Sequence, residues 1–256
     1  LGNTGWGWND VLPYFLKSEN NELGKSEFHN DSGPITVANK KINLKLLDEF
    51  QNAAEEYGIP KTNDFNTGDN TGIGFFQFTT SFNKPGLKLR CSAAKGYLNP
   101  AKKRSNLKII VNAHVQKINF EGKKAIGASY YNGDKLIEVK ADKEVILSSG
   151  AIGSPHILQV SGIGNKEKLK KLGIDIIHES NGVGLNLQDH LMFRPVYKVK
   201  NLKSLNSKVE SIFGRFMMGL EYILNQSGPV TMGASQVCGF VKSDPSRATP
   251  NLQFHV

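Results

Sequence analysis

One stretch of the chain, residues 150–164, has the residue types and spacing of a turn that faces an anionic ligand. It follows an apolar run at 144–149, so a buried strand is expected to end there and a helix to begin. Ser154 suits the N-cap and Pro155 the first helical position, because proline has no N–H to leave unsatisfied. The amides and dipole of such a helix start favour a phosphate, and Gly150 lets a ligand approach the backbone. Taken alone, the same residues also suit an ordinary strand–turn–helix connection.

Side chains for acid–base or nucleophilic chemistry do not form a comparable pattern. Asp189 precedes His190, but side chains adjacent in sequence rarely face each other, and His156 is expected to be an exposed polar residue. The glycines at 68–74 and 182–184 do not follow a buried strand and open a helix, as a dinucleotide fingerprint requires. No serine, cysteine or metal-ligand spacing indicates a site, although six histidines are present: His29, His114, His156, His178, His190 and His255.

Four segments, in order along nearly the whole chain, resemble one enzyme family. Residues 150–164 resemble the second signature of the glucose-methanol-choline (GMC) oxidoreductases, and residues 5–15 resemble the start of that family's substrate region. Residues 183–190, with the sequence VGLNLQDH, resemble its VGxNLQDH motif. Gly228-Pro229 with residues 250–255 is similar to the insect glucose-dehydrogenase-like branch. The chain is identified on this basis as an internal fragment of a GMC oxidoreductase.

The resemblance implies an FAD-dependent oxidoreductase that acts on the CH–OH group of a small-molecule alcohol or sugar. A hydride passes to the flavin while a base takes the hydroxyl proton. In the family the dinucleotide fingerprint lies before the segment where this chain starts, and the catalytic histidine lies beyond Val256. No catalytic residue and no metal ligand is therefore expected here, and the isolated segment is expected to be inactive. The alternative, a non-catalytic relative that binds flavin or has a structural role, stays open.

The resemblance also implies which residues contact FAD. Val115 corresponds to the position whose backbone contacts the adenine end, and the turn containing Gly150 and Ala151 lies close to the ADP half of the cofactor. Asn186 and Leu187 are further candidates, for contact with the cavity. The residues alone favour an ordinary core position for Val115 at the start of a strand.

The periodicity of apolar residues predicts the elements that would position these residues. Turn signals at Glu121-Gly122-Lys123 and Asn132-Gly133 indicate a three-stranded meander up to residue 141, between apolar strands at 107–111 and 144–149. The remaining expected elements are helices at 9–19, capped by Asn9 or Asp10, at 44–57, at 166–172 and at 207–225, and a strand at 174–177.

The resulting fold class is α/β with an α+β substrate part, namely a portion of a GMC-type FAD-binding, doubly wound domain plus a discontinuous substrate domain. The predicted divisions are 1–106 on the substrate side, 107–190 in the FAD-binding domain, and 191–256 again on the substrate side, incomplete. The domain type is what the resemblance implies, because the residues themselves indicate only the meander and its flanking apolar runs.

Composition excludes some functions and leaves others undecided. The formal charge is +9, from 32 Lys and Arg against 23 Asp and Glu, but the basic residues are scattered, so no nucleic-acid partner is expected. No apolar run is long enough for a membrane span. Two cysteines, Cys91 and Cys238, and two glycosylation sequons, at Asn30 and Asn225, would matter if the parent protein is secreted. Compartment and oligomeric state stay open.

Overall fold

A computed structural model describes residues 2–39, 42, 44–80, 90–202, 204–233 and 235–256 of the chain. The chain divides into two compact units, one made of Leu1–Leu107 with Tyr197–Val256 and the other of Lys108–Val196. The bounds of the second unit lie near those of the predicted 107–190 segment, and its assignment to the FAD-binding domain remains a prediction.

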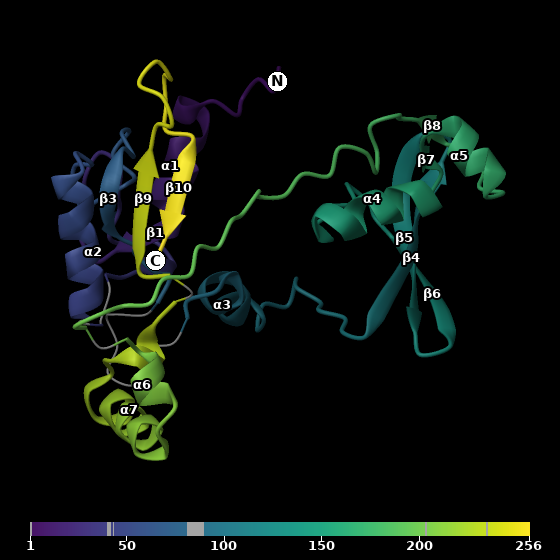
Figure 1. Ribbon diagram of the computed structural model, residues 1–256. Coiled ribbons are helices and arrows are strands. Elements are labelled where there is room, and N and C mark those ends of the chain that lie inside the picture. The colour runs from purple at the N-terminus through teal and green to yellow at the C-terminus, as the bar shows by residue number, and fades with distance from the viewer. Residues whose placement is uncertain (1, 40–41, 43, 81–89, 203, 234) are drawn as a thin grey trace. The chain divides into compact units, whose positions relative to one another are not determined.

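The first unit is built around a small antiparallel sheet with a helix beside it (Figure 1). Sheet order is β10–β9–β3, and α2 lies against β3. Leu47 from α2, Ile73 from β3 and Val237 from β9 form its buried core. The unit's elements are α1 (Trp8–Ser18), β1 (Glu19–Asn21), β2 (Ile35–Val37), α2 (Lys45–Glu56), β3 (Gly72–Phe75), η1 (Ala94–Leu98), α3 (Asn99–Ala101), α6 (Asn206–Val209), α7 (Ile212–Asn225), η2 (Pro229–Thr231), β9 (Val237–Val241) and β10 (Leu252–His255).

The second unit is the predicted meander with a helix packed on it. Three antiparallel strands follow the order β4–β5–β6, and α4 contacts β4 (Figure 1). A two-stranded parallel pair, β7 with β8, follows α4. The unit's elements are β4 (Ala113–Glu121), β5 (Lys124–Asn132), β6 (Lys135–Lys140), α4 (Gly150–Val160), β7 (Ile163–Gly164), α5 (Lys166–Lys171) and β8 (His178–Glu179).

The second hairpin turn lies one residue later than predicted. Asn132 pairs with Lys135, so Gly133 and Asp134 form the two-residue loop. Gly133 has a φ of +60°, whereas Asn132 keeps an ordinary negative φ as the last residue of β5. A glycine in the first loop position is the preference of a type II′ turn, which needs positive φ only there.

The prediction of two flanking apolar strands, at 107–111 and 144–149, is wrong. Both segments have irregular backbone, and Val111 and Ile146 are 70% and 77% exposed. A parallel strand becomes regular only when neighbouring strands accept and donate its backbone hydrogen bonds. Among the described residues, no strand pairs with either segment.

Several predicted boundaries were also wrong, and local hydrogen bonds explain most of them. The 207–225 helix is interrupted because Ser211 accepts the Gly214 N–H at 3.2 Å and caps a new helix, α7. Helix α1 begins one residue early, at Trp8, with Gly7 as N-cap in place of Asn9 or Asp10, and the Asp10 carboxylate accepts the Gly7 N–H at 3.0 Å. The strand expected at 174–177 is instead the short β8 at His178–Glu179.

Candidate cofactor-binding site

Val115 lies on an edge strand of the meander. Its partner is Tyr130 on β5, and the register shifts between Val115 and Lys117. The other side of β4 pairs with no strand among the described residues; instead the Ile118 N–H donates to Ser161 Oγ at 2.9 Å. Val115 is 39% exposed, so a ligand could reach it, and the alternative interpretation of Val115 as a core residue does not fit.

Gly150 and Ala151 lie at the first turn of α4, which begins five residues earlier than predicted. Ser149 is the N-cap, and the expected cap, Ser154, lies inside the helix, where its Oγ accepts the Ser149 N–H at 2.9 Å. Pro155 is likewise inside the helix rather than at its first position. It removes the amide that would bond to the Ala151 carbonyl, which α4 tolerates near its start.

The start of α4 is open to a ligand. Gly150 has a φ of +81°, and a Cβ built on it would meet no atom within 4 Å. The Ser149 side chain makes no capping hydrogen bond, and Gly150, Ala151 and Ile152 are all exposed. Uncapped amides at the start of an eleven-residue helix favour an anionic group.

Asn186 and Leu187 lie in an exposed loop near the other end of α4. A Cβ on Gly184 would lie 2.1 Å from Gln159 Nε2, so the backbone of this loop passes directly over the last turn of the helix. Asn186 has a φ of +57°, and Leu187 is 69% exposed. Asp189 Oδ1 in the same loop accepts the His190 N–H at 2.8 Å.

The predicted residues therefore form two groups rather than one cluster. Gly150 and Gln159 are nine residues apart along α4, which corresponds to about 13 Å at the rise of an α-helix. Gly150 and Ala151 lie at one end of that length, and the loop carrying Asn186 and Leu187 lies near the other. An elongated ligand suits this separation better than a compact one.

No acid–base or metal-binding cluster accompanies these residues. Within the described ranges, no group of three or more His, Cys, Asp or Glu could hold a metal ion. Cys91 and Cys238 are free and buried, and burial raises the pKa of the Cys238 thiol, which disfavours the reactive thiolate. In the part of the chain that the structure describes, no helix is both long and apolar enough to cross a bilayer.

The comparison with protein families gives one match over three quarters of the chain. Residues 1–192 match the family model for GMC oxidoreductases. The chain belongs to the GMC oxidoreductase family. This confirms the family that the four motifs indicated, whereas the insect glucose-dehydrogenase-like branch is not shown.

Curated GMC relatives align over almost all of this chain. The oxygen-dependent choline dehydrogenases of Pectobacterium atrosepticum and Chromohalobacter salexigens are 38% and 39% identical to it over 251 and 252 residues. Each alignment covers 98% of this chain and 44% of the relative. The chain thus spans less than half the length of these curated proteins.

Solved structures of GMC-type enzymes confirm the mixed α/β fold class. An FAD-dependent oxidoreductase from Chaetomium thermophilum matches with a TM-score of 0.81 and 30% identity, over 93% of this chain and 44% of that one. The fold of Aspergillus oryzae formate oxidase matches with a TM-score of 0.75 at 24% identity, covering 92% of this chain and 41% of its own. Both neighbours are named in connection with FAD, which agrees with the predicted cofactor.

Proposed function

We propose that the complete gene product is an FAD-dependent oxidoreductase that acts on the CH–OH group of an alcohol or sugar. Membership of the GMC family over residues 1–192 carries this proposal. FAD would supply the hydride acceptor. The branch similar to insect glucose dehydrogenases remains part of the proposal, supported by Gly228-Pro229 and residues 250–255.

The residues of the second unit fit an extended dinucleotide. Gly150 and Ala151, at the exposed and uncapped start of α4, would hold a phosphate of the ADP half through backbone amides. Val115, on the edge strand β4, would contact the adenine end through its backbone. Asn186 and Leu187, near the far end of α4, would contact a more distant part of the same ligand. Within this proposal, residues 107–190 belong to the FAD-binding domain, with substrate-side segments at 1–106 and 191–256.

The variant G150A tests the assignment of Gly150 to the cofactor, and G133A in the same unit is its matched control. Gly150 and Gly133 both have positive φ, and a Cβ on either would meet no atom within 4 Å. Alanine therefore introduces similar backbone strain at both positions, but only Gly150 would lie against the cofactor.

We expect G150A to weaken FAD binding about tenfold, equivalent to about 1.4 kcal/mol, and G133A to leave it unchanged. Titration of the complete gene product with FAD, followed by quenching of flavin fluorescence, measures both. Equal affinities for G150A and the unsubstituted protein would contradict the assignment of Gly150, and equal weakening by both variants would attribute the effect to fold stability.

The isolated 256-residue chain is proposed to be inactive, because the described residues assigned to the cofactor include no acid–base pair of side chains. A dye-linked assay with choline, glucose and an aryl alcohol, run on this chain and on the complete gene product, tests that claim. Turnover by the isolated chain would overturn it. FAD binding without turnover by the complete product would instead favour the alternative, a non-catalytic flavin-binding relative.

A further inference from the structure

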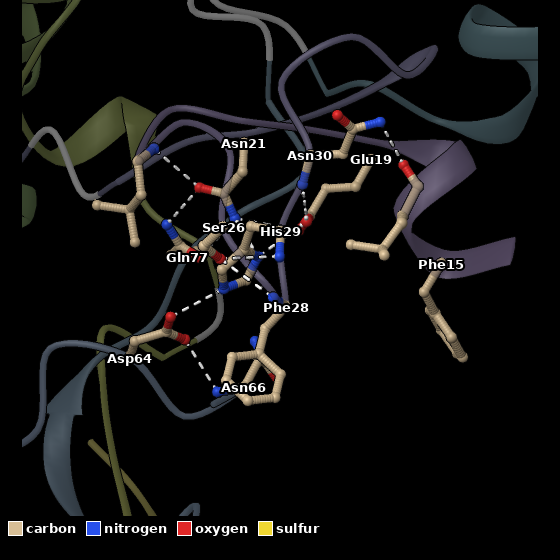
Figure 2. Close-up of polar contacts among 12 residues, drawn as sticks. Phe15, Glu19, Asn21, Ser26, Phe28, His29, Asn30, Asp64, Asn66 and Gln77 are labelled. Carbon is tan, nitrogen blue, oxygen red and sulfur yellow. Dashed lines mark hydrogen bonds and ion pairs between the residues drawn. The ribbon is translucent and has the colours of Figure 1, made fainter. Parts of the chain in front are cut away.

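The first unit contains a histidine buried between two carboxylates, far from the residues assigned to the cofactor along the sequence. His29 is only 5% exposed. Its Nδ1 lies 2.8 Å from Glu19 Oε2, and its Nε2 lies 2.8 Å from Asp64 Oδ2. Figure 2 shows the ring between these side chains, with Asn21 and Gln77 beside them.

The two short contacts determine the charge of the ring. A neutral imidazole has one N–H and one nitrogen lone pair, so one of the two carboxylates would face a lone pair. An imidazolium donates from both nitrogens and satisfies both oxygens. Burial by itself lowers the pKa of His29, but the hydrogen bonds and charges of Glu19 and Asp64 outweigh it and raise that pKa above its ordinary value of 6.5.

The side-chain amide of Asn21, paired with that of Gln77, helps to fix the orientation of the Glu19 carboxylate, and it contacts Oε1 rather than the Oε2 that faces the ring. Asn21 and Gln77 form a reciprocal amide pair, with N···O distances of 3.2 and 3.0 Å. Asn21 Nδ2 also donates to Glu19 Oε1 at 3.0 Å. The Asn21 nitrogen is thereby committed to acceptors, and its 3.1 Å approach to His29 Nδ1 is a neighbouring contact rather than a required hydrogen bond.

The same contacts join three segments that are separate in sequence. Glu19 belongs to β1, and His29 to a turn in which its own N–H donates to Ser26 Oγ at 3.0 Å. Asp64 lies in the irregular segment before β3, where its Oδ1 accepts the Asn66 N–H at 2.9 Å. Among the described residues, Glu19 and Asp64 are the charged side chains paired with His29, whereas Glu22, next along from β1, accepts the Asn39 N–H.

We propose that protonated His29 links β1, the turn at 26–30 and the segment around Asp64 through its two hydrogen bonds to Glu19 and Asp64. Loss of its proton would place a lone pair against a carboxylate oxygen at one end of the ring. Asp64 Oδ2 has no other hydrogen-bond partner among the described residues, whereas Glu19 Oε2 also accepts the Asn30 N–H at 3.4 Å. The first unit then becomes less stable as the pH rises, independently of any bound cofactor.

The sign of the pH dependence follows from linkage between protonation and folding. Unfolded histidine has a pKa of about 6.5, and the folded value is higher, so the folded state binds more protons between these two values. The stabilisation is complete below about pH 6 and is lost as the pH rises through the folded pKa. Carboxylate titration acts at lower pH and does not mimic this loss.

The first test compares thermal unfolding of the 256-residue chain and its H29Q variant from pH 5.5 to 9. The melting temperature of the unsubstituted chain relative to H29Q is expected to be highest near pH 5.5 and to fall as the pH rises above 6.5. H178Q, which removes an exposed histidine from β8, is expected to keep the profile of the unsubstituted chain. Parallel profiles for the unsubstituted chain and H29Q would overturn the proposal.

Two further measurements do not depend on H29Q folding. Nitrogen NMR of the histidine rings is expected to show His29 more than half protonated at pH 6.5, and a mostly neutral ring there would overturn the proposal. E19Q and D64N are each expected to move the loss of stability to lower pH. E49Q, at an exposed carboxylate 3.8 Å from Lys45, is the matched control and is expected to leave the profile unchanged. If E19Q and D64N lose stability at the same pH as the unsubstituted chain, that result would also overturn the proposal.

Discussion

At the scale of single residues, the second unit depends on a serine that connects a strand to a helix. Ser161 is buried, and its Oγ accepts the Ile118 N–H at 2.9 Å while donating to the Ile157 carbonyl. Because Ile118 is also buried, its amide has no access to water if the hydroxyl is removed. This hydrogen bond holds α4 against the strand that carries Val115.

S161A is expected to lower the free energy of unfolding by about 1–3 kcal/mol, the cost of a buried unsatisfied donor. Urea denaturation followed by circular dichroism measures it. S246A is the control, because Ser246 is exposed in a turn where it bonds to Asp244, and surface changes of this kind alter stability by less than about 0.5 kcal/mol. A loss for S161A no larger than that for S246A would contradict the role of Ser161.

The candidate site shows which residue positions a sequence can predict. Gly150 and Ala151 were recognised because small residues after an apolar run indicate a turn, and the structure places them at an open helix start. Ser154 was misplaced because an N-cap and a serine inside the first turns look alike in sequence. His29 had no local signal, since its partners Glu19 and Asp64 lie 10 and 35 residues away and meet it only in the folded chain.

At the scale of elements, periodicity predicted those parts whose partners are close in sequence. The meander β4–β5–β6 is formed by adjacent hairpins, and α2 packs against β3 within the same unit. The runs at 107–111 and 144–149 have strand-like composition, but no strand among the described residues pairs with them. Strand-like composition alone does not produce a strand, because the backbone hydrogen bonds of a strand need a neighbouring chain segment.

One glycine in the meander makes a clear prediction at this scale. A Cβ on Gly127 would lie 2.0 Å from the Val139 carbonyl oxygen of the paired strand β6, a backbone atom that cannot rotate away. G127A is therefore expected to separate β5 from β6 locally and to cost roughly 3 kcal/mol or more, as overpacking does. The free energy of unfolding in urea is the measurement.

The control for G127A lies in a turn of the same sheet. Gly122 has a φ of +58°, and a Cβ there would meet no atom within 4 Å, so G122A introduces only backbone strain of about 1 kcal/mol. Equal losses of stability in G127A and G122A would contradict the prediction, because they would show that the close approach of β5 and β6 does not make glycine necessary at position 127.

At the scale of the whole molecule, the chain consists of two compact units and belongs to the GMC oxidoreductase family. GMC membership covers residues 1–192, and the chain spans 44% of the length of its curated relatives. Large apolar side chains are exposed at 107–111, at Ile146 and on α7. Four motifs predicted the family, and the donor remains a proposal.

The most direct test of the central claim is the anaerobic reaction of the purified complete gene product with an alcohol or sugar. The protein is expected to carry FAD, and choline, glucose or an aryl alcohol is expected to bleach its visible flavin absorption as a hydride is transferred. A product that contains no flavin, even after incubation with added FAD, would contradict the proposed function. Bound flavin that none of the three donors reduces would contradict the catalytic part and favour a binding role.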